Sequence, residues 1–166
     1  KARDIADSTK TLDVDGGTIK LDGNYPTGSN NVALGDAALD ASLTGGKNTA
    51  VGSNALSTNT SGASNTGLGN GALLLNTTGS FNTAIGDDTL LLNTTASNNT
   101  AVGYQSLYAN TTGSALTAVG TAALDANTTG IDNTAVGVSS LGGNTTGNYN
   151  VAVGRTALLN NTTAPR

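Results

Sequence analysis

Hydrophobic and polar positions recur along this chain with a period of 17 residues. Each unit has a glycine, an aliphatic residue just before it, and a leucine four positions after it. The glycines are Gly35, Gly52, Gly69, Gly86, Gly103, Gly120, Gly137 and Gly154, and the leucines are Leu39, Leu56, Leu73, Leu90, Leu107, Leu124, Leu141 and Leu158. Seven positions after each glycine except the first, where Ser42 stands, lies an asparagine: Asn59, Asn76, Asn93, Asn110, Asn127, Asn144 and Asn161. A repeat without insertions predicts that each unit is one structural coil.

The residues within a unit indicate short strands rather than helices. Seventeen residues are too few for a pair of packed helices, which needs about 33, and the recurring N-T-T-G segment is typical of turns. We predict one strand at N-T-A-V-G, with Thr and Val on one face and Ala on the other, and a second strand at A-L-x-x-N. The sequence therefore predicts an all-β fold, a parallel β-solenoid (β-roll) of eight coils over residues 31–166, about 38 Å long at the usual strand spacing.

Stacking such coils would place identical residues above one another in columns. The leucines would form an apolar ladder, and the asparagines could pair amide to amide along the axis. The glycines are expected where the backbone needs a positive φ or a close approach.

Residues 1–30 differ from the repeat and form a separate predicted segment. The stretch from Thr11 to Leu21 alternates apolar and polar residues around Gly16 and Gly17, which predicts a β-hairpin that caps the first coil or connects it to another part. No such cap follows the last repeat, so we expect further chain or another subunit to cover that end. Because the chain begins at Lys1 rather than Met, we expect it to be a fragment or a processed product.

Composition excludes most chemistry. The chain has no His and no Cys, and its net charge is −4, so we expect no enzyme, no cofactor, no metal site and no nucleic-acid partner. Its longest apolar run, Ala72 to Leu75, is far below the roughly 20 residues of a membrane span, so we expect no membrane insertion. Asp13, Asp15 and Gly16 resemble only the start of a calcium loop, and the adjacent Asp87 and Asp88 are interpreted as an exposed turn.

The predicted core of one chain is thin. Each coil offers one leucine, one other large aliphatic residue and two small residues. Several rolls packed side by side could share their apolar strand faces, and we therefore predict a homotrimer. The alternative is a monomeric solenoid with a dry Ala, Val and Leu interior.

The units Asn48 to Gly52, Asn82 to Gly86, Asn99 to Gly103 and Asn133 to Gly137 resemble the repeats of trimeric autotransporter adhesin heads, which carry an N-S-V-A-I-G type core. The resemblance covers residues 31–166 and implies a left-handed parallel β-roll that trimerises. The A-L-x-x-N-T-T-G half is longer here than in that family. The whole unit, with its lead-in from Thr18 to Pro26, is also similar to bacteriophage tail-fibre proteins, especially those of marine phages. Both resemblances imply an extended fibre that contacts a cell surface.

We therefore expect a structural segment of a phage tail fibre or surface adhesin, in a virion or at a cell surface, joined to adjoining fibre segments. It would project, or contribute to, attachment to a host-surface glycan or other receptor, and exposed Phe81, Tyr104, Tyr108 and Tyr149 could contact that glycan. Alternatives are a bacterial cell-surface filament and a monomeric Thr-rich solenoid that binds a regular surface such as ice.

N-glycosylation sequons recur at Asn98 and at the seven repeat asparagines. Because most of them follow the repeat, we interpret these asparagines first as turn and ladder residues.

Overall fold

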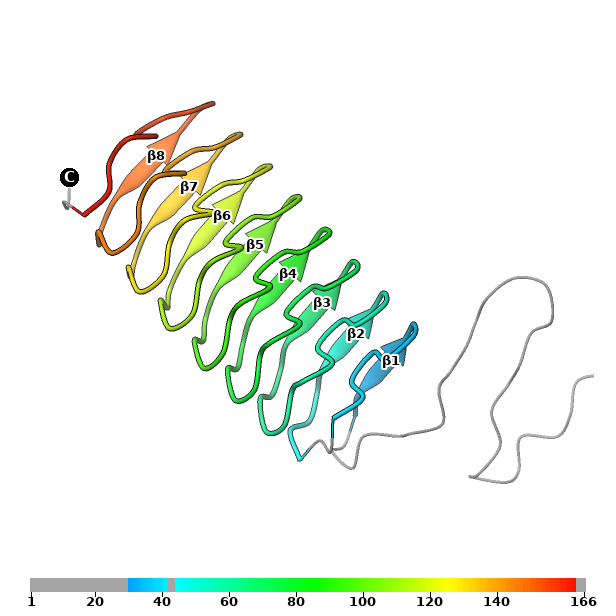
Figure 1. Ribbon diagram of the computed structural model, residues 1–166. Coiled ribbons are helices and arrows are strands. Elements are labelled where there is room, and N and C mark those ends of the chain that lie inside the picture. The colour runs from blue at the N-terminus through cyan, green and yellow to red at the C-terminus, as the bar shows by residue number, and fades with distance from the viewer. Residues whose placement is uncertain (1–29, 42–43, 164–166) are drawn as a thin grey trace, which may run out of the picture.

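The structure, a computed structural model, describes residues 30–41 and 44–163. Eight three-residue strands follow one another along the chain: β1 (Val32–Leu34), β2 (Thr49–Val51), β3 (Thr66–Leu68), β4 (Thr83–Ile85), β5 (Thr100–Val102), β6 (Thr117–Val119), β7 (Thr134–Val136) and β8 (Val151–Val153). They form one parallel sheet in the order β1 to β8, and Figure 1 shows the chain winding once around between each strand and the next. The hairpin predicted for residues 1–30 lies outside the described residues, as do Asp13, Asp15 and Gly16.

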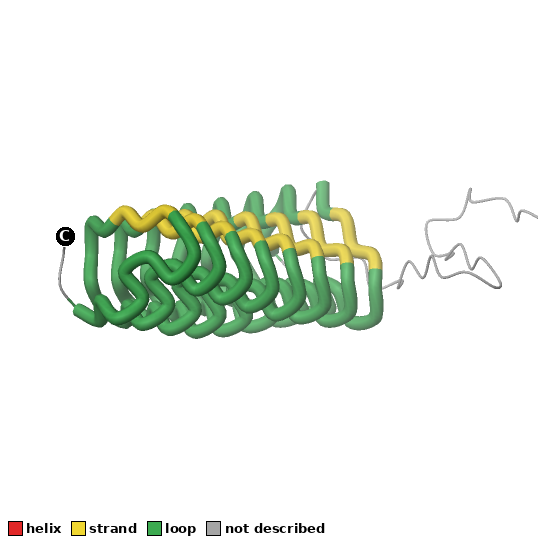
Figure 2. The backbone as a smooth tube through the Cα atoms, turned by 90° about the horizontal axis from the view of Figure 1, so that it is seen from above, coloured by secondary structure: helices red, strands yellow, loops and turns green. Residues whose placement is uncertain are grey.

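Every strand pairs with the next in the same register. Thr49 lies opposite Thr66, and Thr66 lies opposite Thr83, so each turn of the solenoid takes 17 residues. The predicted all-β parallel solenoid is therefore confirmed for the described residues. Figure 2 shows the strands along one side of the solenoid and irregular loops along the other. We call these sides the strand wall and the loop wall.

The first predicted strand is confirmed, including the direction of its side chains. Its central residue points inward and is an alanine in every strand except β3, where it is Gly67. A Cβ added at Gly67 would lie 3.5 Å from Leu56 Cδ1 and 3.2 Å from the Ala72 carbonyl oxygen, so only a very small side chain fits here. Close packing above the leucine column explains the small central residue.

The second predicted strand, at A-L-x-x-N, is wrong. Each repeat leucine has a left-handed backbone, with φ between 51° and 56°, and the residue two positions earlier is left-handed as well. This segment is therefore a chain of tight turns rather than a strand, although its amides still bond along the axis: the Leu56 N–H donates to the Ala72 carbonyl oxygen at 3.0 Å.

A left-handed backbone costs a leucine roughly 1–2 kcal/mol, but burial of its side chain returns a similar or larger amount, about 1.5–3 kcal/mol. From Leu39 to Leu141 these side chains are essentially fully buried. The repeat leucines thus hold the tight turns in place by filling the interior between the walls.

Each repeat glycine forms the corner after its strand. These glycines have φ between 120° and 138°, a region that side chains other than glycine's rarely allow. A Cβ on Gly103 would lie 2.7 Å from the carbonyl carbon of Gly120 in the next coil. The corner therefore requires glycine for both conformation and space.

Two columns of buried asparagines complete the interior. The first, which we call the amide ladder, comprises Asn59, Asn76, Asn93, Asn110, Asn127 and Asn144, and the second, the strand-entry column, comprises Asn48, Asn65, Asn82, Asn99, Asn133 and Asn150. In the amide ladder, Asn76 Nδ2 donates to Asn59 Oδ1 at 2.9 Å and to the Gly79 carbonyl oxygen at 3.0 Å. Hydrogen bonds between side-chain amides thus connect successive coils on the loop wall, as the backbone hydrogen bonds of the sheet connect them on the strand wall.

The described residues include no helix, and hence none long and apolar enough to cross a membrane.

Candidate functional site: the outer face of the sheet

The outer face of the sheet is the most regular surface of the described molecule. The first and third residues of each strand point outward while the central residue points inward. The first position holds threonine from β2 to β7 and valine in β1 and β8, and the third always holds valine, leucine or isoleucine. We call these two outward columns the strand face.

No residue of the strand face carries a charge, although aspartate, lysine and arginine occupy other outward positions. Its aliphatic column is substantially exposed, and Leu68, for example, keeps 45% of its surface open to solvent. With seven steps of about 4.8 Å, the face runs for about 34 Å. A continuous uncharged, half-apolar strip of this length is typical of a surface that another molecule covers.

The threonines of the strand face differ from those of the loop wall. On the loop wall, the hydroxyl of the threonine directly after each ladder asparagine bonds to the next coil, as when Thr77 Oγ1 donates to the Thr94 carbonyl oxygen at 3.0 Å. Among the described residues, the hydroxyls of the strand-face threonines have no protein partner: Thr49, Thr66, Thr83, Thr100, Thr117 and Thr134. These loop-wall threonines therefore support the fold, whereas the strand-face hydroxyls are available to another molecule or to water.

The predicted aromatic contacts do not gather at one place. Phe81 and Tyr149 share one outward column just before a strand and are 63% and 64% exposed, but four coils separate them. Tyr104 follows the glycine corner at the other end of a strand and is 49% exposed, while Tyr108 is half-buried on the loop that follows Leu107. The structure thus brings no two of them together as a single aromatic platform.

The acidic residues are similarly dispersed. Among the described residues no three acidic side chains gather as a metal site would need. Asp87 Oδ1 accepts a hydrogen bond from Asn70 Nδ2 at 3.0 Å on an exposed surface. Burial raises the pKa of Asp125 above its usual value, against the opposing effect of hydrogen bonds from the backbone.

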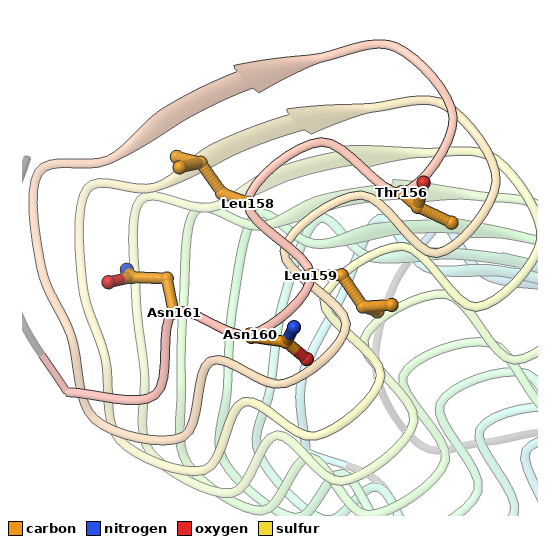
Figure 3. A pocket seen from close by; sticks show the side chains of 5 residues that line it. All are labelled: Thr156, Leu158, Leu159, Asn160 and Asn161. Atoms are coloured by element: carbon orange, nitrogen blue, oxygen red, sulfur yellow. The ribbon is translucent and has the colours of Figure 1, made fainter.

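A hollow of about 470 Å³ lies against the last described coil. Figure 3 shows Leu158 pointing toward β8 and Asn161 pointing into the coil, while Leu159 and Asn160 point to the other side. Leu158 and Asn161 are members of the leucine and asparagine columns that stacking buries in the preceding coils. The neighbouring Asn144 Oδ1 is buried without a hydrogen-bond partner. The hollow is therefore the exposed end of the interior columns.

Sequence reasoning missed the strand-entry column. Asn65 Oδ1 accepts from the Asn82 backbone N–H at 2.9 Å, and Asn82 Nδ2 donates to the Ala96 carbonyl oxygen at 2.8 Å. The signal was present, because the first residue of N-T-A-V-G recurs with the same period as the ladder asparagines. Leu116 is the exception in this column and is also buried.

Comparison with known proteins gives no match to any family model, curated protein or solved structure.

Proposed function

We propose that this chain is a structural segment of a homotrimeric fibre, either a phage tail fibre or a surface adhesin, that supports attachment to a host surface. The strand face is the observation that carries the proposal. It is uncharged along its whole length, and its aliphatic column is too exposed for a chain that works alone in water. Packing three such faces around one axis would bury that column and thicken a core of only a few large side chains per coil.

The role of the segment in the proposal is mechanical. In-register backbone bonds and the amide ladder both run along the long axis, so a pull on the rod loads many hydrogen bonds at once. A virion fibre and a cell-surface adhesin would use such a rod in the same way, to hold a receptor-binding part away from the body that carries it. The adjoining fibre segments, and a glycan or other receptor, are its proposed partners.

The solution mass of residues 1–166 tests the proposal. Light scattering after size exclusion should give about three times the chain mass of 16.2 kDa. Changing both Val119 and Val136 to lysine should reduce this to one chain, because buried unpaired charges are strongly unfavourable in an interface. The matched control changes Thr112 and Thr129, exposed on the loop wall, to lysine and should remain trimeric. A monomeric parent, or a trimer that tolerates the strand-face lysines, would contradict the proposal.

A second candidate function is favoured by the hydroxyls of the strand face. One threonine column and one aliphatic column, both in strict register, form a flat array with a fixed spacing along the axis. A monomer could present this array to a regular surface such as ice. Thermal hysteresis in a solution of the monomer, lost when Thr83 and Thr100 become lysine, would support this function. A trimer that shows no hysteresis would exclude it, because the face would then be covered.

A further inference from the structure

The amide ladder coincides with a run of N-glycosylation sequons. Asparagines followed by any residue except proline and then by Ser or Thr are glycan acceptors. Every member of the ladder satisfies this rule, as in Asn76-Thr77-Thr78. Three asparagines outside the ladder also satisfy it: Asn98, Asn160 and Asn161, of which Asn161 continues the ladder column into the last coil and is half-buried. The structure separates these two groups by accessibility.

No ladder asparagine has room for a saccharide. All six side chains are fully buried. From Asn76 to Asn144 each ladder Nδ2 donates two hydrogen bonds, as when Asn93 Nδ2 donates to Asn76 Oδ1 at 2.8 Å and to the Ala96 carbonyl oxygen at 3.1 Å. Even a Cβ on Gly62 would lie 2.9 Å from Asn76 Nδ2, and one on Gly113 would lie 2.8 Å from Asn127 Nδ2. A single carbon atom is already too close, so a sugar ring cannot be placed there.

Asn98 and Asn160 are exposed. Asn98 lies in the same outward column as Phe81 and Tyr149, whose large side chains project into solvent. Its backbone N–H donates to the Ser80 carbonyl oxygen at 3.1 Å, a bond that a substituent on the side-chain amide leaves untouched. A glycan at either position would therefore extend away from the solenoid.

We propose that N-glycosylation and folding of this chain are mutually exclusive at the amide ladder, and that Asn98 and Asn160 are the positions where the solenoid tolerates an N-linked glycan. In the transfer reaction, Nδ2 bonds to the anomeric carbon of a saccharide carried on a polyprenyl pyrophosphate. The carbon–oxygen bond to that carrier breaks, the pyrophosphate leaves with the electron pair, and Nδ2 gives up one proton. The donor acts on the unfolded chain, where ladder and exposed asparagines are equally accessible.

The proposal has a consequence for where the chain is made. Each ladder asparagine that receives a saccharide loses one hydrogen bond and brings a bulky polar group to a buried position. The solenoid can then form only in a compartment that lacks this lipid-linked donor or its transferase. This conclusion rests on the buried amides and is independent of the proposed fibre function.

The chain offers a variant that separates the two groups of asparagines. The sequons of the six ladder asparagines and of Asn161 each end in an exposed residue whose hydroxyl has no protein partner among the described residues: Ser61, Thr78, Thr95, Thr112, Thr129, Thr146 and Thr163. Changing these seven residues to alanine removes the sequons of the ladder and of Asn161. All asparagines remain in place, and the sequons of Asn98 and Asn160 are kept.

The parent chain and the seven-alanine variant would be directed through the secretory pathway of a glycosylating eukaryotic cell. The parent should carry ladder glycans and remain inside the cell in a protease-sensitive form. The variant should be secreted folded, with a glycosidase-sensitive mass increase at Asn98, Asn160 or both, which Asn98→Gln and Asn160→Gln remove. Both chains, made without glycosylation in a bacterial cytosol, should give the same β-rich circular dichroism spectrum.

A second measurement keeps the test independent of the variant's own folding. When synthesis of the lipid-linked saccharide is blocked, the parent chain should be secreted folded from the same cells. A parent secreted folded with saccharides mapped to ladder asparagines would overturn the exclusion. A folded variant that carries no saccharide at either Asn98 or Asn160 would overturn their assignment as tolerant positions.

Discussion

The two walls of the solenoid differ in how far their axial hydrogen bonds depend on side chains. On the strand wall, backbone amides of adjacent strands bond to each other, and β3 tolerates Gly67 where the other strands have alanine. On the loop wall, backbone bonds such as that from the Thr77 N–H to the Thr94 carbonyl oxygen are joined by a ladder of side-chain amide bonds, and the asparagine column is unbroken from Asn59 onward. A backbone ladder can be supplied by almost any residue, whereas a side-chain ladder requires one residue type. The loop wall should therefore be the more sensitive of the two to substitution.

The largest expected effect lies at the corner that joins the walls. Gly103→Ala would force a Cβ to 2.7 Å from the Gly120 backbone in a conformation that alanine rarely adopts. We expect a loss of about 3–5 kcal/mol in unfolding free energy, measured by urea denaturation. Gly142→Ala is the control. The atom closest to a Cβ added at Gly142 is Leu159 Cδ1, at 3.1 Å, which lies at the end of a flexible side chain and can move. Equal losses in the two variants would contradict the assigned role of the corner.

The next effect tests the loop wall directly. Asn93→Ala removes two hydrogen bonds donated by its Nδ2 and leaves the buried Asn110 Nδ2 without its Oδ1 acceptor. The expected loss is about 3 kcal/mol, since each unsatisfied buried group costs about 1–3 kcal/mol. Thr95→Ala, in the same loop but exposed, should change stability by less than about 0.5 kcal/mol. Chemical denaturation of both variants would show whether the difference is real.

A smaller difference is expected within the strand-entry column. Leu116 shows that a leucine fits where the other described coils have asparagine. Asn82→Leu should therefore lose less stability than Asn82→Ala, by about 1 kcal/mol, because the leucine refills the space and adds apolar burial. Thermal unfolding of the pair gives the comparison. A leucine variant less stable than the alanine variant would show that this column depends on its amides as strongly as the ladder does.

The smallest effect concerns pH. Because burial raises the folded-state pKa of Asp125 above its unfolded value, ionisation of this group opposes folding. Its destabilising contribution is complete above the folded pKa and disappears as the pH falls toward the unfolded value. Asp125→Asn should flatten the dependence of stability on pH in this window, as followed by urea midpoints at several pH values. An unchanged pH profile would contradict the inference from burial.

The regular part of the fold could be predicted from sequence because its signals repeat. The period, the direction of the strand side chains and the corner glycines all follow from residue type and spacing. The second strand could not be predicted correctly, since leucine in a left-handed conformation contradicts its local preference and is stabilised only by burial between the walls. Tertiary packing determines the conformation of that segment, and no local sequence pattern predicts it.

The candidate site was only partly visible in the sequence. Thr and Val were assigned to one face of the strand from alternation alone. That their two columns form one continuous, uncharged strip depends on the shared register of eight strands, which the structure provides. For the aromatic residues, a shared column does not produce a shared site. Phe81 and Tyr149 occupy the same position of the 17-residue repeat, but four coils separate them along the axis.

The fixed register between strands also has a genetic consequence. Because adjacent coils have the same length and interchangeable contacts, unequal recombination between two repeats of the gene would add or remove whole coils. Both walls would remain continuous in the product, and every interior column would gain or lose one member. Reach could then vary between descendants of one gene without any change in the contacts that stabilise the rod.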